Sequence, residues 1–308
     1  MARPSRMTSI VDAVGNTPLI RLRNVAREVD PVKVYLKLEY LNPGGSIKDR
    51  PALQIMKDAI GDGRLTKDKI LIDATSGNTG VAYSIFGAAL GYRVALVMPG
   101  NVSQARKDIT QAYGTELIFS DPMEQSDGAI RHCRALVAEN PNKYFYADQY
   151  RNPSNPLAHY LGTGQEILDQ VGDEITHFVA GLGTSGTVMG VTRRLHEHSR
   201  PITCVAAEPA EALHALEGLK HMPSSIVPEI YDPNLPDEHM SVTTDDGWNM
   251  ADRLAEEEGL HVGHSAGANV FAAIEIAKRQ KTGAVVTIAC DRGDRYFAPM
   301  RWEKHYEW

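Results

Sequence analysis

Val94-Ala95-Leu96-Val97-Met98 is a run of apolar residues as long as a typical β-strand, and no polar side chain interrupts it. Val285-Val286-Thr287-Ile288-Ala289 has nearly the same character further along the chain. Strands without polar alternation are typical of parallel sheets, in which helices cover both faces. These two runs therefore predict an α/β fold with parallel-rich sheets.

Short β-rich runs alternate with longer helical patterns along the chain, as they do where helices connect parallel strands. The expected strands are Lys33–Glu39, Lys69–Ala74, Arg93–Met98, Thr115–Ser120, Ile175–Ala180, Ile202–Ala207 and Ala284–Cys290. The expected helices are Ile47–Gly61, Thr79–Leu90, Gln104–Tyr113, Gln125–Glu139, Leu157–Gln170, Thr187–His198, Asp246–Glu258 and Ala266–Lys281. This order supports the same α/β assignment.

The chain has 308 residues, with 32 Lys and Arg against 39 Asp and Glu, which gives a net charge of −7. At roughly 150 residues per domain, this length predicts two domains. Binding to nucleic acids or to anionic membranes needs a basic face, so the acidic balance argues against both kinds of partner. No stretch has the ~18 consecutive apolar residues of a membrane-spanning helix, and the N-terminal residues lack the apolar core of a signal peptide. We therefore expect a cytoplasmic protein.

Cysteine and histidine spacing gives no sign of a disulfide framework or a metal site. Cys133, Cys204 and Cys290 lie far apart in sequence, which fits neither paired disulfides nor a CxxC motif, so reduced thiols are expected. His196 and His198 are two residues apart and would point to different sides of a helix, unlike the i, i+4 histidines of a zinc-binding helix. No metal is therefore expected.

Two proline-containing segments interrupt the alternation of strands and helices. Asn140–Pro156 is expected to connect the two α/β halves. Pro209–Asp245 contains five prolines and is expected to form a functional lid or wall, with a surface loop as the alternative.

Four junctions between an expected strand and the next helix carry glycine-rich or polar residues, and ligands collect at the C-terminal ends of parallel strands. In the first junction, residues 42–50, Lys48 lies in the first turn of a helix. A lysine there opposes the positive end of the helix dipole, which favours the neutral amine that Schiff-base chemistry requires. An ordinary solvated lysine is the alternative interpretation.

The second junction, Thr75-Ser76-Gly77-Asn78-Thr79-Gly80, consists of small polar residues and glycines at the start of a helix. Side-chain hydroxyls and amides, together with free backbone N–H groups, can form a cradle for a carboxylate or phosphate. A helix cap would need only one such residue, so an anion-binding loop is the favoured interpretation.

The third junction, Gly181-Leu182-Gly183-Thr184-Ser185-Gly186-Thr187, matches the GxGxxG pattern of dinucleotide-binding folds. Glu208 follows at about the distance of a ribose-binding acid, so an NAD-dependent oxidoreductase is one hypothesis. The three hydroxyls of the loop favour instead a phosphate monoester with three exposed oxygens. The spacing alone leaves both hypotheses open.

The fourth junction, Gly263–Ala268, places Ser265 before the last long helix. Together with Asp291–Tyr296, which follow the final strand, it is expected to bring a hydroxyl and two ion-paired acids to the same crevice. A helix cap and a ligand-binding hydroxyl remain equally open for Ser265.

In this order the junctions resemble the fold-type II pyridoxal-phosphate enzymes of the cysteine synthase and cystathionine β-synthase family. The resemblance extends from Ile10 to about Tyr296. It rests on Gly45–Arg50, Thr75–Gly80 and Gly183–Thr187, and similarity to the isozyme B type of cysteine synthase rests on Met98–Gln104, Ile175–Phe178 and Cys290–Tyr296. It implies two three-layer α/β domains with parallel-rich twisted sheets, and the cofactor pyridoxal 5'-phosphate (PLP) in the cleft between them.

The resemblance also implies roles for individual residues. Lys48 would form the internal aldimine with PLP and would move the Cα proton of the substrate. Asn78 would contact the ring 3′-oxygen, and Ser265 would contact the pyridine nitrogen. The cofactor phosphate would be held by Gly183, Thr184, Ser185, Gly186 and Thr187. The substrate α-carboxylate would be bound by Thr75, Ser76, Thr79 and Gln149.

The implied reaction is that of a PLP-dependent cysteine synthase, β-replacement on an activated L-serine. O-acetyl-L-serine or O-phospho-L-serine would lose its β-substituent to leave an α-aminoacrylate, and sulfide or thiosulfate would add to give L-cysteine or S-sulfocysteine. The resemblance further implies a homodimer. In each subunit, residues 46–156 would form a smaller, mobile domain, and residues 1–45 plus 157–308 a larger, PLP-binding domain.

Lys220 stands where isozyme B relatives have an arginine that faces the entrance of the active site. Lysine keeps the positive charge but loses the bidentate fork, so we expect Lys220 to contact an anionic group of the substrates as a point charge. Residues 297–308 also depart from the family pattern. We expect them to take part in packing or in a dimer contact.

Other classes of protein remain open. Among PLP enzymes, a cystathionine β-synthase-like enzyme or a serine/threonine deaminase is the main alternative. The oxidoreductase hypothesis leaves Lys48 and Thr75–Gly80 without a role. A binding protein that has kept the fold and lost the chemistry is disfavoured by the intact Lys48.

Overall fold

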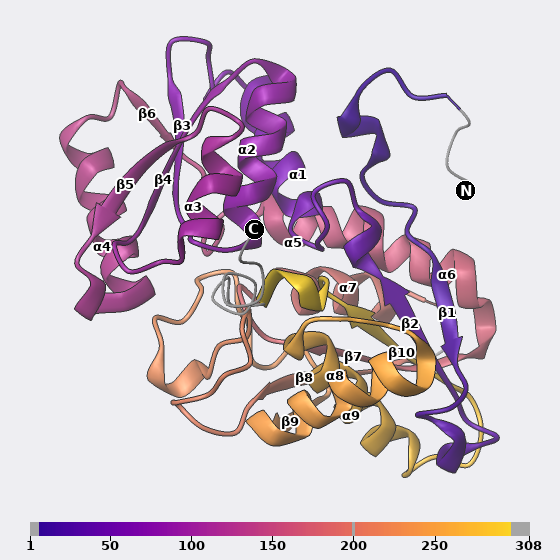
Figure 1. Ribbon diagram of the computed structural model, residues 1–308. Coiled ribbons are helices and arrows are strands. Elements are labelled where there is room, and N and C mark those ends of the chain that lie inside the picture. The colour runs from indigo at the N-terminus through magenta and orange to yellow at the C-terminus, as the bar shows by residue number, and fades with distance from the viewer. Residues whose placement is uncertain (1–5, 199–200, 297–308) are drawn as a thin grey trace, which may run out of the picture.

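Two β-sheets, each with helices packed on both faces, form the frame of the structure (Figure 1). The computed structural model describes residues 6–198 and 201–296, so the tail at 297–308 lies outside the described residues. The smaller sheet takes its strands from residues 70–146, and the larger sheet from residues 19–38 and 175–289. The predicted α/β fold with parallel-rich sheets is confirmed.

The smaller sheet has four parallel strands in the order β5-β4-β3-β6. Its strands are β3 (Ile70–Ala74), β4 (Arg93–Pro99), β5 (Glu116–Ser120) and β6 (Tyr144–Tyr146), and its helices are α1 (Asp49–Gly61), α2 (Asn78–Leu90), α3 (Gln104–Gln111) and α4 (Gln125–Glu139). Helices α1 and α2 cover one face, where Phe86 packs in the same apolar cluster as Leu71. Helix α4 covers the other face, where Ile130 joins Ile72. Both faces of β3 are therefore buried.

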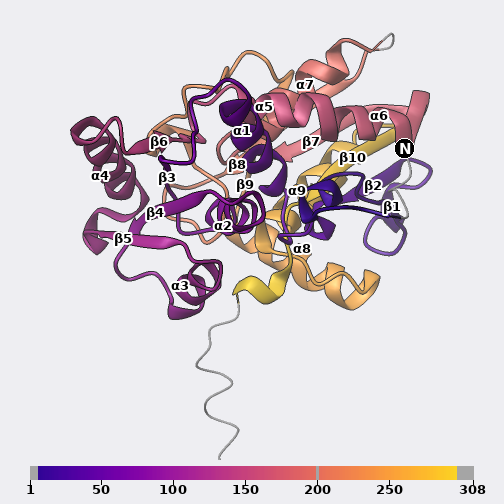
Figure 2. The same ribbon diagram turned by 90° about the horizontal axis from the view of Figure 1, so that it is seen from above.

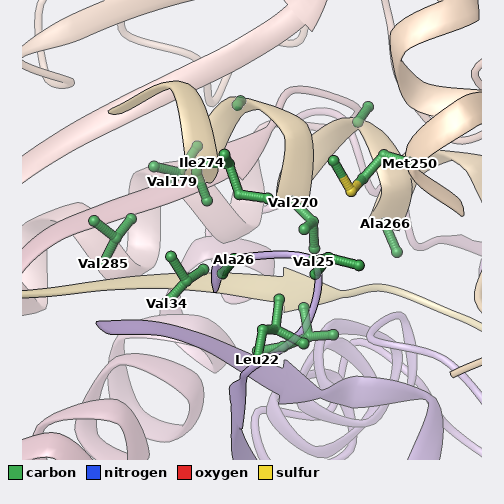
Figure 3. Close-up of a cluster of buried hydrophobic side chains, with 14 of the residues drawn as sticks. Leu22, Val25, Ala26, Val34, Val179, Met250, Ala266, Val270, Ile274 and Val285 are labelled. Atoms are coloured by element: carbon green, nitrogen blue, oxygen red, sulfur yellow. The ribbon is translucent and has the colours of Figure 1, made fainter. Parts of the chain in front are cut away.

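The larger sheet has six strands in the order β1-β2-β10-β7-β8-β9, and only the edge strand β1 is antiparallel to its neighbour among the described strands. Its strands are β1 (Leu19–Leu22), β2 (Lys33–Leu38), β7 (Ile175–Gly181), β8 (Thr203–Pro209), β9 (Glu238–Val242) and β10 (Ala284–Ala289). Its helices are α6 (Gln165–Val171) and α7 (Gly186–His196) on one face, and α8 (Thr244–Glu258) and α9 (His264–Ala277) on the other. Val34 and Val285 of adjacent strands face Val270 and Ile274 of α9 (Figure 3).

Helices α1 and α5 (Ser154–Ala158) pack against each other between the two sheets (Figure 2). The predicted domains are residues 46–156 and residues 1–45 plus 157–308. This division separates the strands of one sheet from those of the other, and the domain limits stay a prediction. In the two described ranges, no helix is both long enough and apolar enough to cross a membrane.

Three strands were not predicted, and two of them lie in the segments assigned to a connection and a lid. Strand β6 lies inside Asn140–Pro156, and β9 lies inside Pro209–Asp245. Both are short edge strands, which exist because they pair with β3 and β8 rather than because of their own periodicity. The segment Asn140–Pro156, predicted to connect the two halves, therefore also contributes an edge strand.

The helix predicted at Leu157–Gln170 is also different in the structure. Helix α5 runs through a π-helical turn, His159–Gly164, into α6. Gly164 and Gly190 lie at close approaches to neighbouring chain, and a Cβ at Gly164 would lie 2.8 Å from Cβ of Arg194. The wide turn thus fits against α7, a tertiary contact that sequence periodicity does not report.

A buried cluster of charges connects the two halves of the chain. Glu39 and Arg50 are 0% and 5% exposed, and Arg50 Nε donates to Glu39 Oε2 at 2.6 Å. Arg50 Nη1 also donates to Glu166 Oε1 of α6 at 2.7 Å, and Lys37 Nζ lies 2.9 Å from Glu166 Oε2. Burial alone would raise the pKa of Glu166. Hydrogen bonds and charge from Arg50 and Lys37 outweigh burial and hold this pKa below its usual value, so the carboxylate stays ionised.

We expect Arg50→Met to lower the free energy of unfolding by about 3–5 kcal/mol, because it leaves the buried Glu39 carboxylate without its counter-ion. Urea denaturation followed by circular dichroism measures this change. Arg64→Met is the control, since Arg64 and its partner Asp62 are about half exposed and their pair should contribute little. Equal shifts of the denaturation midpoint in both variants would contradict the role given to the buried cluster.

Candidate functional site

A cavity of about 720 Å³ lies where loops at the C-terminal ends of strands from both sheets meet. All four junctions predicted from the sequence contribute to its lining. The predicted site residues that line it are Lys48, Thr75, Ser76, Asn78, Thr79, Gln149, Gly183, Thr184, Ser185, Thr187, Lys220 and Ser265. Gly186 is the exception, because it lies beneath the lining against Asn155, where a Cβ would collide with the amide oxygen.

Lys48 is the N-cap residue of α1, directly before Asp49, rather than a residue of the first turn as predicted. It is half-buried and lines the cavity, and among the residues that the structure describes no acceptor lies within hydrogen-bonding distance of its ammonium group. Its backbone N–H donates to Ser46 Oγ at 3.2 Å. Two residues further on, Arg50 is held in the buried charge cluster, so the start of α1 is fixed on both sides of Lys48. The result is an unpaired amine on a rigid support.

The loop Gly181–Thr187 turns the N-terminus of α7 toward the cavity. Ser185 has φ +70°, a left-handed conformation that non-glycine residues rarely adopt. Its hydroxyl is buried and, among the described residues, has no hydrogen-bond partner. A Cβ at Gly183 would collide with the Gly218 carbonyl oxygen, so only glycine fits there. An unpartnered hydroxyl at the positive end of a helix is suited to an anion with several oxygens.

Two buried side chains support this loop from behind. Asn155 Nδ2 donates to Thr184 Oγ1 at 3.1 Å, and His159 Nε2 lies 3.4 Å from Thr187 Oγ1. Burial, and then the charges of Arg50 and Lys48, lower the pKa of His159 well below its usual value, so the ring is neutral. The hydroxyls of the loop are therefore fixed by neutral partners and remain directed at the cavity.

Asn78 is held by groups from the far end of the chain. Its Nδ2 donates to Asp291 Oδ2 at 2.6 Å, and Arg295 donates to its Oδ1. The Tyr296 hydroxyl donates to the same Asp291 oxygen. Asp291 thus accepts hydrogen bonds here, while the other acid of this stretch, Asp294, pairs with Arg292. These contacts fix the orientation of the Asn78 amide.

Thr79 and Gln149 form a buried polar pair on the side of the smaller sheet. Thr79 Oγ1 donates to Gln149 Oε1 at 2.7 Å. Asp73, at the end of β3, accepts from the Gln149 N–H at 3.2 Å and from the Ala74 N–H at 2.8 Å. Burial and the nearby charge of Asp148 raise the pKa of Asp73 to about 7. Asp73 therefore holds the loops that carry Thr75 and Gln149 at a fixed spacing.

Ser265 lies on the opposite wall beside a thiol. Burial raises the pKa of this thiol, Cys290, to about 11. Asn269 donates to Cys290 Sγ at 3.5 Å, and its own Oδ1 is buried without a partner among the described residues. Cys133, Cys204 and Cys290 are all free thiols.

The sequence interpretation missed several residues of the site. Cys290 was treated only as a reduced thiol, although it lines the cavity. Asn269 could have been noticed as a lone amide in the apolar helix α9, whereas no local signal distinguishes Asn155 or His159. These two lie in a segment that packs behind the loop only in the folded chain.

Lys220 lies at the mouth of the cavity with a partner from the smaller sheet. Its Nζ is 3.7 Å from Asp127 Oδ1 and 5.2 Å from the centre of the Tyr150 ring. Burial lowers the pKa of Lys220, and Asp127 offsets this only in part. The positive charge predicted for this position is thus present, but it already faces a carboxylate.

Two residues that prompted other hypotheses lie elsewhere. Glu208 does not line the cavity, and its Oε2 accepts from the Met222 N–H at 3.4 Å. His196, Cys204 and Asp237 come within 4.8 Å of one another. Asp237 Oδ2 lies 3.0 Å from His196 Nε2 and accepts from the Cys204 N–H at 2.7 Å, so these contacts are accounted for without an ion. The absence of a metal stays a prediction.

Comparison with known proteins gives close matches over nearly the whole chain. The family model for pyridoxal-phosphate dependent enzymes matches residues 10–291. A cysteine synthase of Aquifex aeolicus is 47% identical over 300 residues, covering 96% of this chain and 91% of that protein. Cysteine synthase B of Escherichia coli is 41% identical over 292 residues, covering 95% of each. The crystal structure of O-acetyl serine sulfhydrylase isoform 3 from Entamoeba histolytica matches with a TM-score of 0.92 at 34% identity, covering 100% of this chain and 95% of that one.

We expect the free energy of unfolding to fall as pH rises from about 4 to about 7, because the buried site favours protonated Asp73, whose pKa is raised from 3.8 to about 7. The stabilisation is fully present at a pH below the pKa of Asp73 in the unfolded chain. It is lost as the pH rises through the pKa of Asp73 in the folded protein. Asp73→Asn stays neutral and should lose this part of the pH dependence in urea titrations. The exposed Asp252→Asn is the control. An Asp73→Asn profile parallel to the wild type would contradict the assignment.

Proposed function

The chain belongs to the family of pyridoxal-phosphate dependent enzymes, and we propose that its reaction is β-replacement on an O-activated L-serine at the cavity of Lys48. The resemblance inferred from the junction loops is confirmed, since the family model spans residues 10–291. Relatives 41–47% identical over nearly the full chain make it a PLP-dependent cysteine synthase. The observation that carries the proposal is the unpaired Lys48 amine, which shares one cavity with an anion-binding loop and a second polar loop.

The residues present fit the cofactor. The buried, unpartnered hydroxyl of Ser185 at the N-terminus of α7 suits a phosphate monoester, with Gly183, Thr184, Gly186 and Thr187 completing the loop. Asn78 would contact the ring oxygen, and Ser265 the ring nitrogen. When bound through Lys48, PLP supplies an electron sink that makes the Cα–H bond of the substrate acidic. The NAD-dependent alternative loses its support, because Glu208 lies outside the cavity lining.

Lys48 then acts as the proton carrier. Once the amino group of the substrate has released Lys48 as a free amine, its Nζ accepts the proton from Cα of the substrate, and the β-substituent departs from Cβ with its bonding electrons. The sulfur nucleophile bonds to Cβ, and Lys48 returns the proton to Cα. The absence of a fixed acceptor for its ammonium among the described residues leaves the amine free for this exchange.

The substrate carboxylate is assigned to the polar loop on the smaller sheet. Thr75, Ser76, Thr79 and Gln149 line the cavity there. The Thr79–Gln149 hydrogen bond and the support from Asp73 pre-organise these donors, which reduces the cost of ordering them when the carboxylate binds.

The proposal for the activated serine and the sulfur donor rests on Lys220, at the mouth of the cavity. An O-acetyl-L-serine needs no cation at Cβ, whereas O-phospho-L-serine and thiosulfate carry a second anionic group that Lys220 can contact. We propose O-acetyl- or O-phospho-L-serine as the first substrate, and sulfide or thiosulfate as the second. We further propose a cytoplasmic homodimer without nucleic-acid or membrane partners, in keeping with the net charge of −7.

Purified protein should be yellow, and borohydride should fix the cofactor covalently to Lys48, which peptide mass spectrometry detects. Lys48→Ala should lower the rate of cysteine formation from O-acetyl-L-serine and sulfide by at least about a hundred-fold, because the proton carrier is lost. The exposed Lys57→Ala on the same helix is the matched control. A colourless protein that binds NAD, or a label on another lysine, would overturn the proposal. Release of pyruvate without cysteine would indicate a deaminase.

Lys220→Ala should raise the KM for O-phospho-L-serine and for thiosulfate about ten-fold, because a hydrogen bond to a charged group is lost. The KM for O-acetyl-L-serine should stay within about two-fold, since its acetyl group is neutral. Lys220→Arg keeps the charge and is the matched control. Unchanged kinetics for all three compounds would rule out the contact.

A further inference from the structure

Two charged pairs cross the mouth of the cavity between the segment after β8 and helices of the smaller sheet. Arg106 of α3 pairs with Glu217, and Asp127 of α4 lies 3.7 Å from Lys220. Arg106, Glu217 and Lys220 line the cavity. Asp127 does not, but its neighbour Ser126 does, so the carboxylate stands just behind the rim.

The position of Asp127 is fixed by the same segment. Its second oxygen, Oδ2, accepts from the Ile226 N–H at 3.4 Å. Further along, the Ile230 N–H donates to the Tyr150 carbonyl at 3.3 Å, and Arg151 pairs with Glu229 at 2.9 Å. Each carboxylate oxygen of Asp127 thus has a partner in this segment, which orients the side chain toward Lys220.

Among the cations of the cavity that have a partner, Lys220 holds its partner at the longest distance. Among the described residues, four Lys or Arg side chains line the cavity: Lys48, Arg106, Lys220 and Arg295. Arg106 is engaged by Glu217, and Arg295 by Asn78 and the Gly44 carbonyl. The Lys220–Asp127 separation of 3.7 Å is longer than the 2.7–2.9 Å of a strong charge-assisted hydrogen bond. An anionic ligand can therefore displace Asp127 from Lys220 more easily than it can displace the partners of Arg106 or Arg295.

We propose that Asp127 is a specificity-determining residue, a built-in counter-ion of Lys220 with which an anionic leaving group or sulfur donor must compete. The inference rests on the proposed β-replacement function. The Lys220 and Asp127 side chains are 14% and 32% exposed, so solvent screens the competition only in part. A neutral acetyl group does not take part in it. The balance between Lys220 and Asp127 therefore sets how strongly the enzyme prefers neutral over dianionic substrates.

Asp127→Asn should lower the KM for O-phospho-L-serine and for thiosulfate by about three- to ten-fold, because one negative charge near the bound anion is removed. The KM for O-acetyl-L-serine, with sulfide as donor, should change less than about two-fold. Inorganic phosphate, the leaving group of O-phospho-L-serine, should become a better inhibitor by a similar factor. These constants are measured by steady-state kinetics on the holoenzyme.

Two variants separate charge from packing. Asp127→Glu keeps the carboxylate and should behave as the wild type. Glu139→Gln removes an exposed carboxylate at the other end of α4 and should change none of the three KM values and not the inhibition by phosphate. If Asp127→Asn changes the KM for charged and neutral substrates equally, or changes neither, Asp127 is only a structural clasp and the inference is wrong. If the wild-type holoenzyme makes no cysteine from any of these pairs, the proposed function fails instead.

Discussion

The bidentate grip of Arg50 on Glu39 and Glu166 is the constraint on which the rest of the structure depends. Glu39 follows a strand of the larger sheet, Glu166 lies on a helix that covers that sheet, and Arg50 lies on a helix of the smaller sheet. Because all three groups are largely buried, none can leave its partners without stranding a charge in a poorly solvated interior. The cluster therefore fixes the start of helix α1 against the half of the chain that carries the larger sheet and, two residues from Arg50, the position of Lys48.

Hydroxyl and amide side chains make up most of the polar lining of the cavity. The buried Ser185 hydroxyl has no partner among the described residues, while Asn78 and Thr79 are oriented by hydrogen bonds to Asp291 and Gln149. In the proposed function, a phosphate and a carboxylate would bind mainly through these neutral groups. A net charge of −7 is then no obstacle to two anionic ligands at one place, because local donors rather than the sum of charges would receive them.

Most of the fold could be predicted from the sequence. Strands that are buried on both faces of either sheet are visible in the sequence as apolar runs. The edge strands β1, β6 and β9 could not, since they are defined by pairing with a distant partner. The π-helical turn at His159–Gly164 was not predicted either, because it too depends on contacts with a distant part of the chain. Among the site loops, those with unusual composition were found, and the supporting residues Asn155, His159 and Asp73 were missed or passed over because their own neighbourhoods in sequence are ordinary.

The sequence by itself determined the fold class, the four polar junctions and the lysine at the start of a helix, because each depends on residues that are adjacent in the chain. Only the tertiary structure decided which groups meet. It brought Asp291 and Arg295 to Asn78 from more than 200 residues away, and it placed Asp127 beside Lys220. Contacts of this kind depend on how helices and sheets pack, and a short window of sequence carries no information about packing partners.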